Sequence, residues 1–491
     1  MKARIQYLFL LAALMAGLEL IPARRAAAQA FTILYNFTSD SSGGNIDGGS
    51  PNADLILSGD TLYGTAEFGG NSDLGTVFAL NTNGSGFAEA WRFIGSSEVT
   101  STSEGVGPVA GVTLLGDTLY GTTPFGGSAN EGAVFSVKTN GGPYTAVHNF
   151  TSLSSTGGTY GTNSDGGYPY AGLILSGNTL YGTVFFGGAS GWGTVFAVNT
   201  DSSGFTNLHS FTGGGEGANP YGGLILSGST LYGTTSSGFI PGEQSGFGTV
   251  FALNTNGSGF TTLYSFTNGI DGSQPFGGLI LSGDILYGTA YAGGSSGWGT
   301  VFALHTNGSD FTSLYTFTNG NDGSQPWAEL MLSGSILYGT ATRGGSANSG
   351  TVFSVTTNGS NFTTLHGFTA SVYDGISAYT NSDGNSPMCG LILSGNTLYG
   401  TAEGGGSGGS GTIFSISLAS VGALQLGILA AGTSVVLTWP TNEAGFTLQS
   451  TTNLVSPVAW SAVSPAPFVV NGQNTVTNPI SGIPMFFRLS Q

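Results

Sequence analysis

The sequence predicts an all-β fold: a seven-bladed β-propeller of four-stranded blades, closed by the N-terminal strand and followed by a small C-terminal β-sandwich. Two motifs that each recur seven times carry this prediction. Leu-Tyr-Gly-Thr recurs at a spacing of about 56 residues, which is typical of a repeat architecture. Gly-Thr-Val-Phe follows each copy, as Gly-Ala-Val-Phe in the second and Gly-Thr-Ile-Phe in the seventh. The tyrosines of the first motif are Tyr63, Tyr120, Tyr181, Tyr232, Tyr287, Tyr338 and Tyr399.

Each copy contains four short runs rich in Thr, Val, Tyr and Phe, in which large apolar residues alternate with small or polar ones. In the fifth copy, we expect strands at Leu279–Ser282, Ile285–Tyr291, Gly299–Leu304 and Phe311–Phe317. Gly283 and Gly308 fall between the first and second and between the third and fourth of these runs, where tight hairpins need positive φ.

The two ends of the repeat region favour a closed propeller over a solenoid. Phe31–Phe37 matches the fourth strand of a repeat, whereas the seventh copy ends near Leu418 without one. We expect the N-terminal strand to complete the last blade, a permutation that a solenoid does not require because it uses capping repeats.

Three regions follow from this reading. Residues 1–30 have the basic start, apolar run and Ala28-Gln29-Ala30 site of a secretory signal peptide. Residues 31–418 are the predicted propeller, and residues 419–491 the sandwich, with Trp439 and Trp460 expected in its core. The predicted location is therefore secreted, extracellular or at the cell surface, with no transmembrane segment.

Composition narrows the choice of partners. The net charge is −17, so the protein repels nucleic-acid phosphates and anionic lipid. The single cysteine, Cys389, excludes a disulfide within the chain and is expected to be a small buried residue. An oligomeric state does not follow from the sequence.

The ordered motifs Leu-Tyr-Gly-Thr, Gly-Thr-Val-Phe and Asp-Gly-x-x-Pro resemble the Gloeo/Verruco (GloVer) tandem repeat of exported bacterial proteins over about Phe31 to Leu418. The resemblance implies export but no established activity and no catalytic residues. The tail, which contains Phe486-Phe487-Arg488-Leu489, resembles C-terminal β-domains of other exported proteins.

An acidic residue followed by glycine precedes the first strand of every copy, and five of these acids are aspartates. One interpretation is a ring of oxygen ligands for Ca²⁺ or another hard cation. The other is a turn in which the carboxylate accepts a backbone N–H, and it is favoured because each blade supplies only one acid. No cofactor is otherwise expected. The aspartates are Asp47, Asp165, Asp271, Asp322 and Asp383.

Propeller topology places the loops before the first strand and before the third strand of each copy on one face, and aromatic residues gather in these loops. Four of them follow the proline of the acid-Gly-x-x-Pro segment, and three more precede the Gly-Thr-Val-Phe strand. Aromatic rings beside carboxylates and amides suit carbohydrate binding. The alternative, which is favoured, is that the rings pack between blades or plug the central channel. The candidates are Tyr170, Tyr221, Phe276 and Trp327 after proline, and Trp192, Phe247 and Trp298 before the strand.

Signals of catalysis are weak. His148, His209 and His366 occupy a strand position that is tyrosine in other copies. No nucleophile-elbow or zinc-protease motif is present. The leading hypothesis is a non-enzymatic propeller that binds a carbohydrate or another surface ligand. The alternatives are a polysaccharide lyase or glycoside hydrolase that uses two carboxylates of this face, and a structural or adhesive protein.

Overall fold

The computed structural model describes residues 30–38, 45–94, 104–154, 161–238, 246–373, 375, 379–418, 426–431, 433–440, 447–452, 460–464, 466–470, 473–479 and 485–490. All regular elements in these ranges are β-strands, which confirms the all-β prediction. Among these residues, no helix is long and apolar enough to cross a membrane. The predicted signal peptide lies outside the described residues, except for Ala30.

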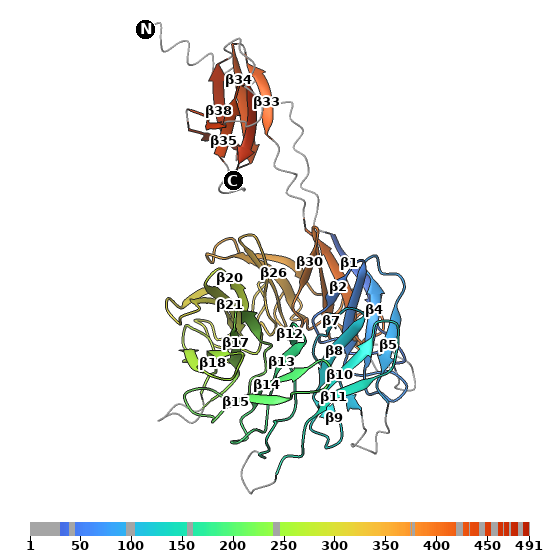
Figure 1. Ribbon diagram of the computed structural model, residues 1–491. Coiled ribbons are helices and arrows are strands. Elements are labelled where there is room, and N and C mark those ends of the chain that lie inside the picture. Colours follow the sequence, from blue (N-terminus) through green and yellow to red (C-terminus); the bar gives the residue numbers. More distant parts are fainter. Residues whose placement is uncertain are drawn as a thin grey trace. The chain divides into compact units, whose positions relative to one another are not determined.

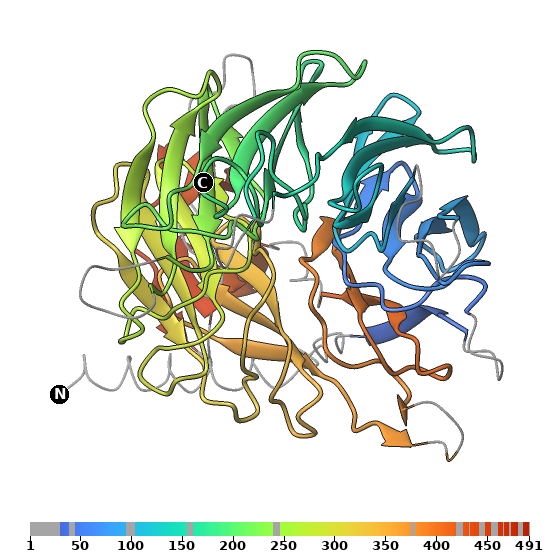
Figure 2. The ribbon, with the colours of Figure 1, turned by 90° about the horizontal axis from the view of Figure 1, so that it is seen from below.

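Two compact units divide the chain. Gln29–Leu418 forms one, and Ala419–Gln491 belongs to the other. Four-stranded antiparallel sheets recur throughout Gln29–Leu418, like the blades of a propeller, and follow one another around a common centre (Figures 1 and 2).

The fifth sequence copy illustrates one sheet. It contains β20 (Ile280–Ser282), β21 (Ile285–Ala290), β22 (Thr300–His305) and β23 (Thr312–Thr316), paired in sequence order. Each strand begins and ends within one residue of its prediction. Gly283 has φ +62° in the turn between β20 and β21, the left-handed conformation that glycine tolerates best.

The other sheets of this unit repeat the pattern. They are β2 (Ile56–Ser58), β3 (Thr61–Ala66), β4 (Thr76–Asn81) and β5 (Ala88–Arg92); β7 (Thr113–Leu115), β8 (Thr118–Thr123), β10 (Ala133–Lys138) and β11 (Thr145–Asn149); β12 (Ile174–Ser176), β13 (Thr179–Val184), β14 (Thr194–Asn199) and β15 (Thr206–Ser210); β16 (Ile225–Ser227), β17 (Thr230–Thr235), β18 (Thr249–Asn254) and β19 (Thr261–Ser265); β24 (Met331–Ser333), β25 (Ile336–Ala341), β26 (Thr351–Thr356) and β27 (Thr363–Gly367); and β30 (Ile392–Ser394), β31 (Thr397–Ala402), β32 (Thr412–Ser417) and β1 (Ala30–Asn36). Two minor hairpins pair β6 (Gly105–Val106) with β9 (Phe125–Gly126) and β28 (Val372–Tyr373) with β29 (Tyr379–Thr380).

The N-terminal strand β1 is the outer strand of the sheet formed by β30, β31 and β32. It pairs antiparallel with β32, from Ala30 opposite Ser417 to Asn36 opposite Thr412. The first described strand of the chain therefore completes a sheet whose other three strands lie more than 350 residues later.

The threonine of Leu-Tyr-Gly-Thr links neighbouring sheets. In each copy its hydroxyl donates a hydrogen bond of 2.8–3.2 Å to a backbone carbonyl at the entrance to the innermost strand of another sheet. These bonds run from Thr65 to Ala110, Thr122 to Ala171, Thr183 to Gly222, Thr234 to Gly277, Thr289 to Ala328, Thr340 to Cys389, and Thr401 to Ala53. The last bond joins the sheet of β30–β32 to that of β2–β5.

Hydrophobic cores lie between adjacent sheets. One cluster combines Tyr232 and Val250 of one sheet with Leu286 and Phe302 of the next. Gly288 in β21 leaves room for the ring of Phe302, because a Cβ there would lie 2.6 Å from that ring's Cζ. The glycine and phenylalanine of the two motifs are thus one packing unit.

The unit that contains Ala419–Gln491 has two sheets. One is formed by β33 (Gly427–Ala431), β34 (Ser434–Pro440), β38 (Gln473–Pro479) and β37 (Phe468–Val470), and the other by β36 (Ser461–Ala462), β35 (Thr447–Thr451) and β39 (Phe486–Ser490). Leu437, Trp439 and Val476 of the first sheet share a core with Leu448 of the second. Trp439 is buried as expected, whereas Trp460 is partly exposed and lies beneath the guanidinium of Arg488, 4.4 Å from the ring centroid.

A substitution of Phe37 tests the packing of the N-terminal segment against the sheet β2–β5. Phe37 follows β1, is fully buried, and packs with Leu55 and Phe78 of the sheet β2–β5. We expect Phe37→Ala to lower the free energy of unfolding by about 3–5 kcal/mol, because it leaves a core cavity. Urea unfolding measures this, with the exposed Phe68→Ala as a control that changes it by less than about 0.5 kcal/mol. Equal effects of the two variants would contradict the packing described.

Candidate functional site

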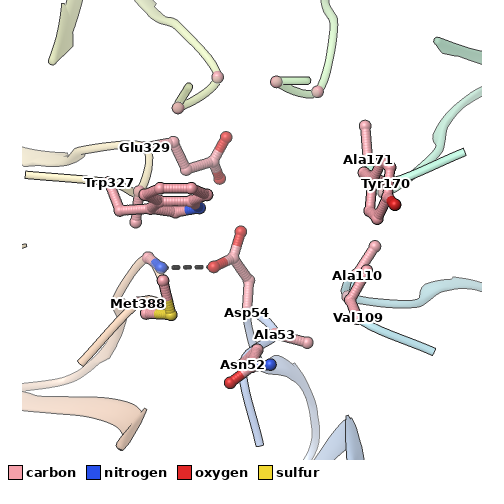
Figure 3. Close-up of a pocket in the computed structure, with 18 of the residues that line it drawn as sticks. Asn52, Ala53, Asp54, Val109, Ala110, Tyr170, Ala171, Trp327, Glu329 and Met388 are labelled. Carbon is pink, nitrogen blue, oxygen red and sulfur yellow. Dashed lines mark hydrogen bonds between the residues drawn. The ribbon is translucent and has the colours of Figure 1, made fainter. Parts of the chain in front are cut away.

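A cavity of about 610 Å³ opens among the innermost strands of Gln29–Leu418 (Figure 3). Its lining includes, from every copy, the residue that follows the proline of the acid-Gly-x-x-Pro segment. Those residues are Asn52, Val109, Tyr170, Tyr221, Phe276, Trp327 and Met388. Each copy therefore contributes the residue at one equivalent position to the same cavity, and the residue type at this position differs between copies.

Four contiguous copies supply an aromatic wall, which consists of Tyr170, Tyr221, Phe276 and Trp327. The rings of Tyr170 and Tyr221 stack with centroids 5.1 Å apart, and those of Phe276 and Trp327 stack at 4.3 Å. Tyr221 also meets Phe276 and Trp327 edge-on at 5.5 and 5.4 Å. The remaining copies place Asn52, Val109 and Met388 around the cavity, so the site is lopsided.

Two motif contacts position each wall residue. For Trp327, the hydroxyl of Thr289 binds the carbonyl of the next residue, Ala328. The preceding Pro326 packs against Gly299, where a Cβ would lie 2.6 Å from the proline Cδ. Because the backbone is held on both sides, the cavity is built on rigid elements.

Two carboxyl groups point into the cavity near Trp327 (Figure 3). Asp54 accepts a hydrogen bond from the backbone N–H of Gly390. Glu329 forms no hydrogen bond with the described residues. The two acids flank Gly390: a Cβ on that glycine would lie 3.1 Å from both Asp54 Oδ1 and Glu329 Cγ. Three adjoining sheets thus bring these groups together.

Burial makes these carboxyls hard to ionise. It raises the pKa of Glu329 from 4.5 to about 8, and the nearby charge of Asp54 adds to the rise. Burial also raises the pKa of Asp54, although the hydrogen bond from Gly390 opposes this. At neutral pH, the pair therefore retains a proton that two exposed carboxyls would release.

Two further acids, Glu67 and Glu403, line the same cavity. Burial raises the pKa of both; the charge of Glu403 also raises that of Glu67, whereas Arg343 lowers that of Glu403. Asn52 donates a hydrogen bond of 2.8 Å to Glu67 Oε2, while its own buried Oδ1 has no partner. None of the described lining residues is Lys, Arg or His.

The structure does not bring the other three aromatic candidates to this cavity. Trp192 is partly buried against a core with Phe211 and Phe251. Phe247 likewise packs against the core beside Phe266. Trp298 is 39% exposed. The sequence placed all seven aromatics in loops of one face, but only the four that follow proline share the cavity.

The candidate metal ligands lie in the loops between consecutive sheets, where each is bound by the last strand of the preceding sheet and the threonine that follows it. Asp271 accepts hydrogen bonds from the hydroxyl of Tyr264 at 3.1 Å, and from the backbone N–H and hydroxyl of Thr267 at 2.8 and 2.7 Å. Equivalent Thr and Tyr or His contacts hold the others, which are Asp47, Asp165, Asp322 and Asp383. All five aspartates are buried. The described residues contain no group of three or more His, Cys, Asp or Glu arranged to hold a metal ion.

The histidines take the place of tyrosine in this arrangement. His148 Nε2 lies 3.1 Å from Asp165, and His366 Nε2 lies 2.9 Å from Asp383. His209 pairs in the same way with Glu216, at 2.9 Å. Each histidine therefore closes an acid-containing turn, and none of the three lines the cavity.

Sequence reasoning missed Asp54 and Glu329. In the other five copies, the same position is glycine: Gly111, Gly172, Gly223, Gly278 and Gly390. An alignment of the copies would have exposed the departure, because two acids at an otherwise small position are not explained by the repeat.

The chain belongs to the Gloeobacter/Verrucomicrobia repeat family, whose model matches residues 23–163, 155–317 and 242–426. A comparison with curated protein sequences finds no match.

Solved structures show only distant likeness. An oligogalacturonate lyase in complex with manganese is 12% identical, with a TM-score of 0.47 over 79% of this chain and 93% of the lyase. A nidogen/laminin complex is 15% identical, with a TM-score of 0.37 over 62% of this chain and 92% of that chain. A puromycin-hydrolysing peptidase of Mycobacterium tuberculosis is 11% identical, with a TM-score of 0.43 over 83% of this chain and 62% of the peptidase. These likenesses carry no inference about activity.

The buried carboxyl of Glu329 predicts a pH dependence of stability. Its pKa is higher in the folded protein than in the unfolded chain, so the free energy of unfolding falls as pH rises from about 4.5 to about 8. Glu329→Gln removes this loss. We expect the variant to melt at least about 2 °C above the wild type at pH 9, with a smaller difference at pH 5.

Thermal denaturation across pH measures this effect. Asp60→Asn in the exposed turn between β2 and β3 serves as the control and should track the wild type. A difference between Glu329→Gln and wild type that does not change with pH would contradict the raised pKa.

Proposed function

We propose that this is an exported protein, secreted or held at the cell surface, whose repeats form a seven-bladed β-propeller closed by β1 and carrying a small β-sandwich. The propeller binds a carbohydrate or another extracellular ligand in the cavity. Membership of the repeat family, the pairing of β1 with β32, and the bond from Thr401 to Ala53 support this architecture.

The observation that carries the binding proposal is the aromatic wall facing carboxyl and amide groups across one cavity. Aromatic rings offer flat apolar surface to the C–H faces of a sugar, while Asp54, Glu329 and Asn52 offer polar atoms for its hydroxyls. Among the described residues, the buried Oδ1 of Asn52 has no hydrogen-bond partner to give up. A purely structural repeat protein has no need for such a site.

We expect the aromatic wall to dominate the affinity. Trp327→Ala and Tyr221→Ala should each weaken ligand binding about 10- to 100-fold, because each removes a large apolar surface from the cavity. A polysaccharide array identifies the ligands of the purified protein, and calorimetric titration then gives the dissociation constants.

Trp298→Ala is the matched control, because this tryptophan is exposed and lies outside the cavity lining. It should change affinity by less than about twofold. Binding that persists in both wall variants, or that falls equally in Trp298→Ala, would move the site elsewhere.

Glycoside hydrolysis is a second candidate function. The paired carboxyls Asp54 and Glu329 favour it, since a glycosidase needs one protonated and one ionised carboxyl on either side of the bond it cleaves. The raised pKa of Glu329 suits the acid, and the hydrogen bond to Asp54 suits the ionised partner.

Release of reducing ends from the glycans that bind tests this candidate. Hydrolysis predicts release that falls at least about 100-fold in Glu329→Gln and is unchanged in Asp60→Asn. Glycans that bind and remain intact would leave the non-enzymatic function standing.

A further inference from the structure

We propose that the group recognised in this cavity is a cation, an ammonium carried by the ligand, held between the aromatic wall and the paired carboxyls Asp54 and Glu329. The proposal rests on the function proposed above and specifies its ligand chemistry: an amine-bearing or quaternary ammonium ligand rather than a neutral one.

The charge balance of the cavity is the first argument. Four acids, Asp54, Glu67, Glu329 and Glu403, line it, and no basic residue does. The nearest cation acting on them is Arg343, which affects Glu403 and is itself exposed at the protein surface. Carboxylates removed from water are costly unless a cation pairs with them. Asn52 and Gly390 donate hydrogen bonds to Glu67 and Asp54, but no cation of the described lining pairs with any of the four acids. A ligand cation is the partner that this set lacks.

The position of Glu329 is the second argument. Its side chain is partly buried, its carboxyl points into the cavity, and it accepts no hydrogen bond from the described residues (Figure 3). The repeat does not require an acid there, because Gly278 and Gly390 serve at the same position in other copies. An acid that folding does not need, directed at an open space, fits a role in binding.

The aromatic wall is the third argument. Aromatic faces attract ammonium groups through the negative potential of the ring, most strongly for tryptophan and in a site removed from water. Figure 3 shows Trp327 next to both carboxyl groups. A neutral sugar would use the acids only as hydrogen-bond partners, whereas an ammonium group would also compensate their charge.

Binding of a cation should release a proton. Glu329 is held largely protonated at pH 7 by its burial and by Asp54. The other titratable groups of the lining, namely Glu67, Glu403, Tyr170 and Tyr221, add no positive charge. Arg343 lies outside the lining and acts on Glu403. An ammonium group favours the ionised carboxylate, so affinity for a permanent cation should rise as pH rises through about 8.

The experiment compares two isosteric probes on the full chain by calorimetric titration. Choline carries a quaternary ammonium, and 3,3-dimethyl-1-butanol replaces its nitrogen with carbon. We expect choline to bind at least about tenfold more tightly at pH 8.5. Titration at pH 7 in two buffers of different ionisation enthalpy should show release of a fraction of a proton up to about one.

Variants assign the effect to the cavity. Glu329→Gln should weaken choline binding at least about tenfold and abolish proton release, while leaving affinity for the neutral isostere unchanged. Asp60→Asn should behave as the wild type. Equal affinity for choline and its isostere, or full choline binding in Glu329→Gln with proton release intact, would overturn the proposal.

A second probe pair separates this proposal from the function on which it rests. Hexamers of glucosamine and of N-acetylglucosamine differ in the charge of the amine. Tighter binding of the glucosamine hexamer at pH 6 supports both carbohydrate binding and recognition of a cation. Tighter or equal binding of the acetylated hexamer overturns the cation but keeps carbohydrate binding. Choline binding without either hexamer keeps the cation and argues against a glycan of this class. Silence of all four probes would overturn the cation proposal.

Discussion

The hydrogen bond from the threonine of Leu-Tyr-Gly-Thr to the entrance of another sheet is the constraint on which the rest of the repeat unit depends. Backbone groups within a sheet satisfy one another, whereas consecutive copies are joined at particular points: by this threonine bond and by loop backbone bonds such as that from the Gln325 N–H to the carbonyl of Trp298. A buried hydroxyl on a backbone carbonyl fixes both spacing and register, since leaving that carbonyl unpaired would be costly. Thr289 and Ala328 show the consequence, because the bond also anchors the backbone beside Trp327.

Within each repeat, the positions that pack the sheets together differ from the position that lines the cavity. The glycine and phenylalanine of the motifs must fit one another, as Gly288 and Phe302 do, so they tolerate little change. The residue after the proline lines the cavity and belongs to none of the hydrophobic clusters between sheets. Equivalent positions are therefore free to hold Asn52, Tyr221 or Trp327, and a sevenfold pattern can present a one-sided site.

The acidic residues likewise fall into two groups, one that stabilises turns and one that lines the cavity. Asp271 and its equivalents lie between two sheets. They accept hydrogen bonds from a tyrosine or histidine of the last strand of the preceding sheet and from the threonine after that strand, and they stabilise the turn that leads to the cavity. Asp54 and Glu329 have almost no such support, and burial makes their ionisation costly. A carboxyl that lacks compensation inside a protein is a functional candidate, because folding alone does not account for it.

The sequence by itself determined the all-β class and, in the fifth copy, the bounds of the four strands to within one residue. It also identified the aromatic residues after the prolines as candidates for a site. It could do so because strand alternation and turn glycines are local, and because seven copies report the same signal. Only the tertiary structure decided which aromatic residues meet: Tyr170 and Trp327 share the cavity, whereas Trp192 packs into a core. It also paired Asp54 with Glu329, which are 275 residues apart along the chain. Contacts of this kind depend on how sheets are arranged around a centre, and no local pattern encodes which two copies will face each other.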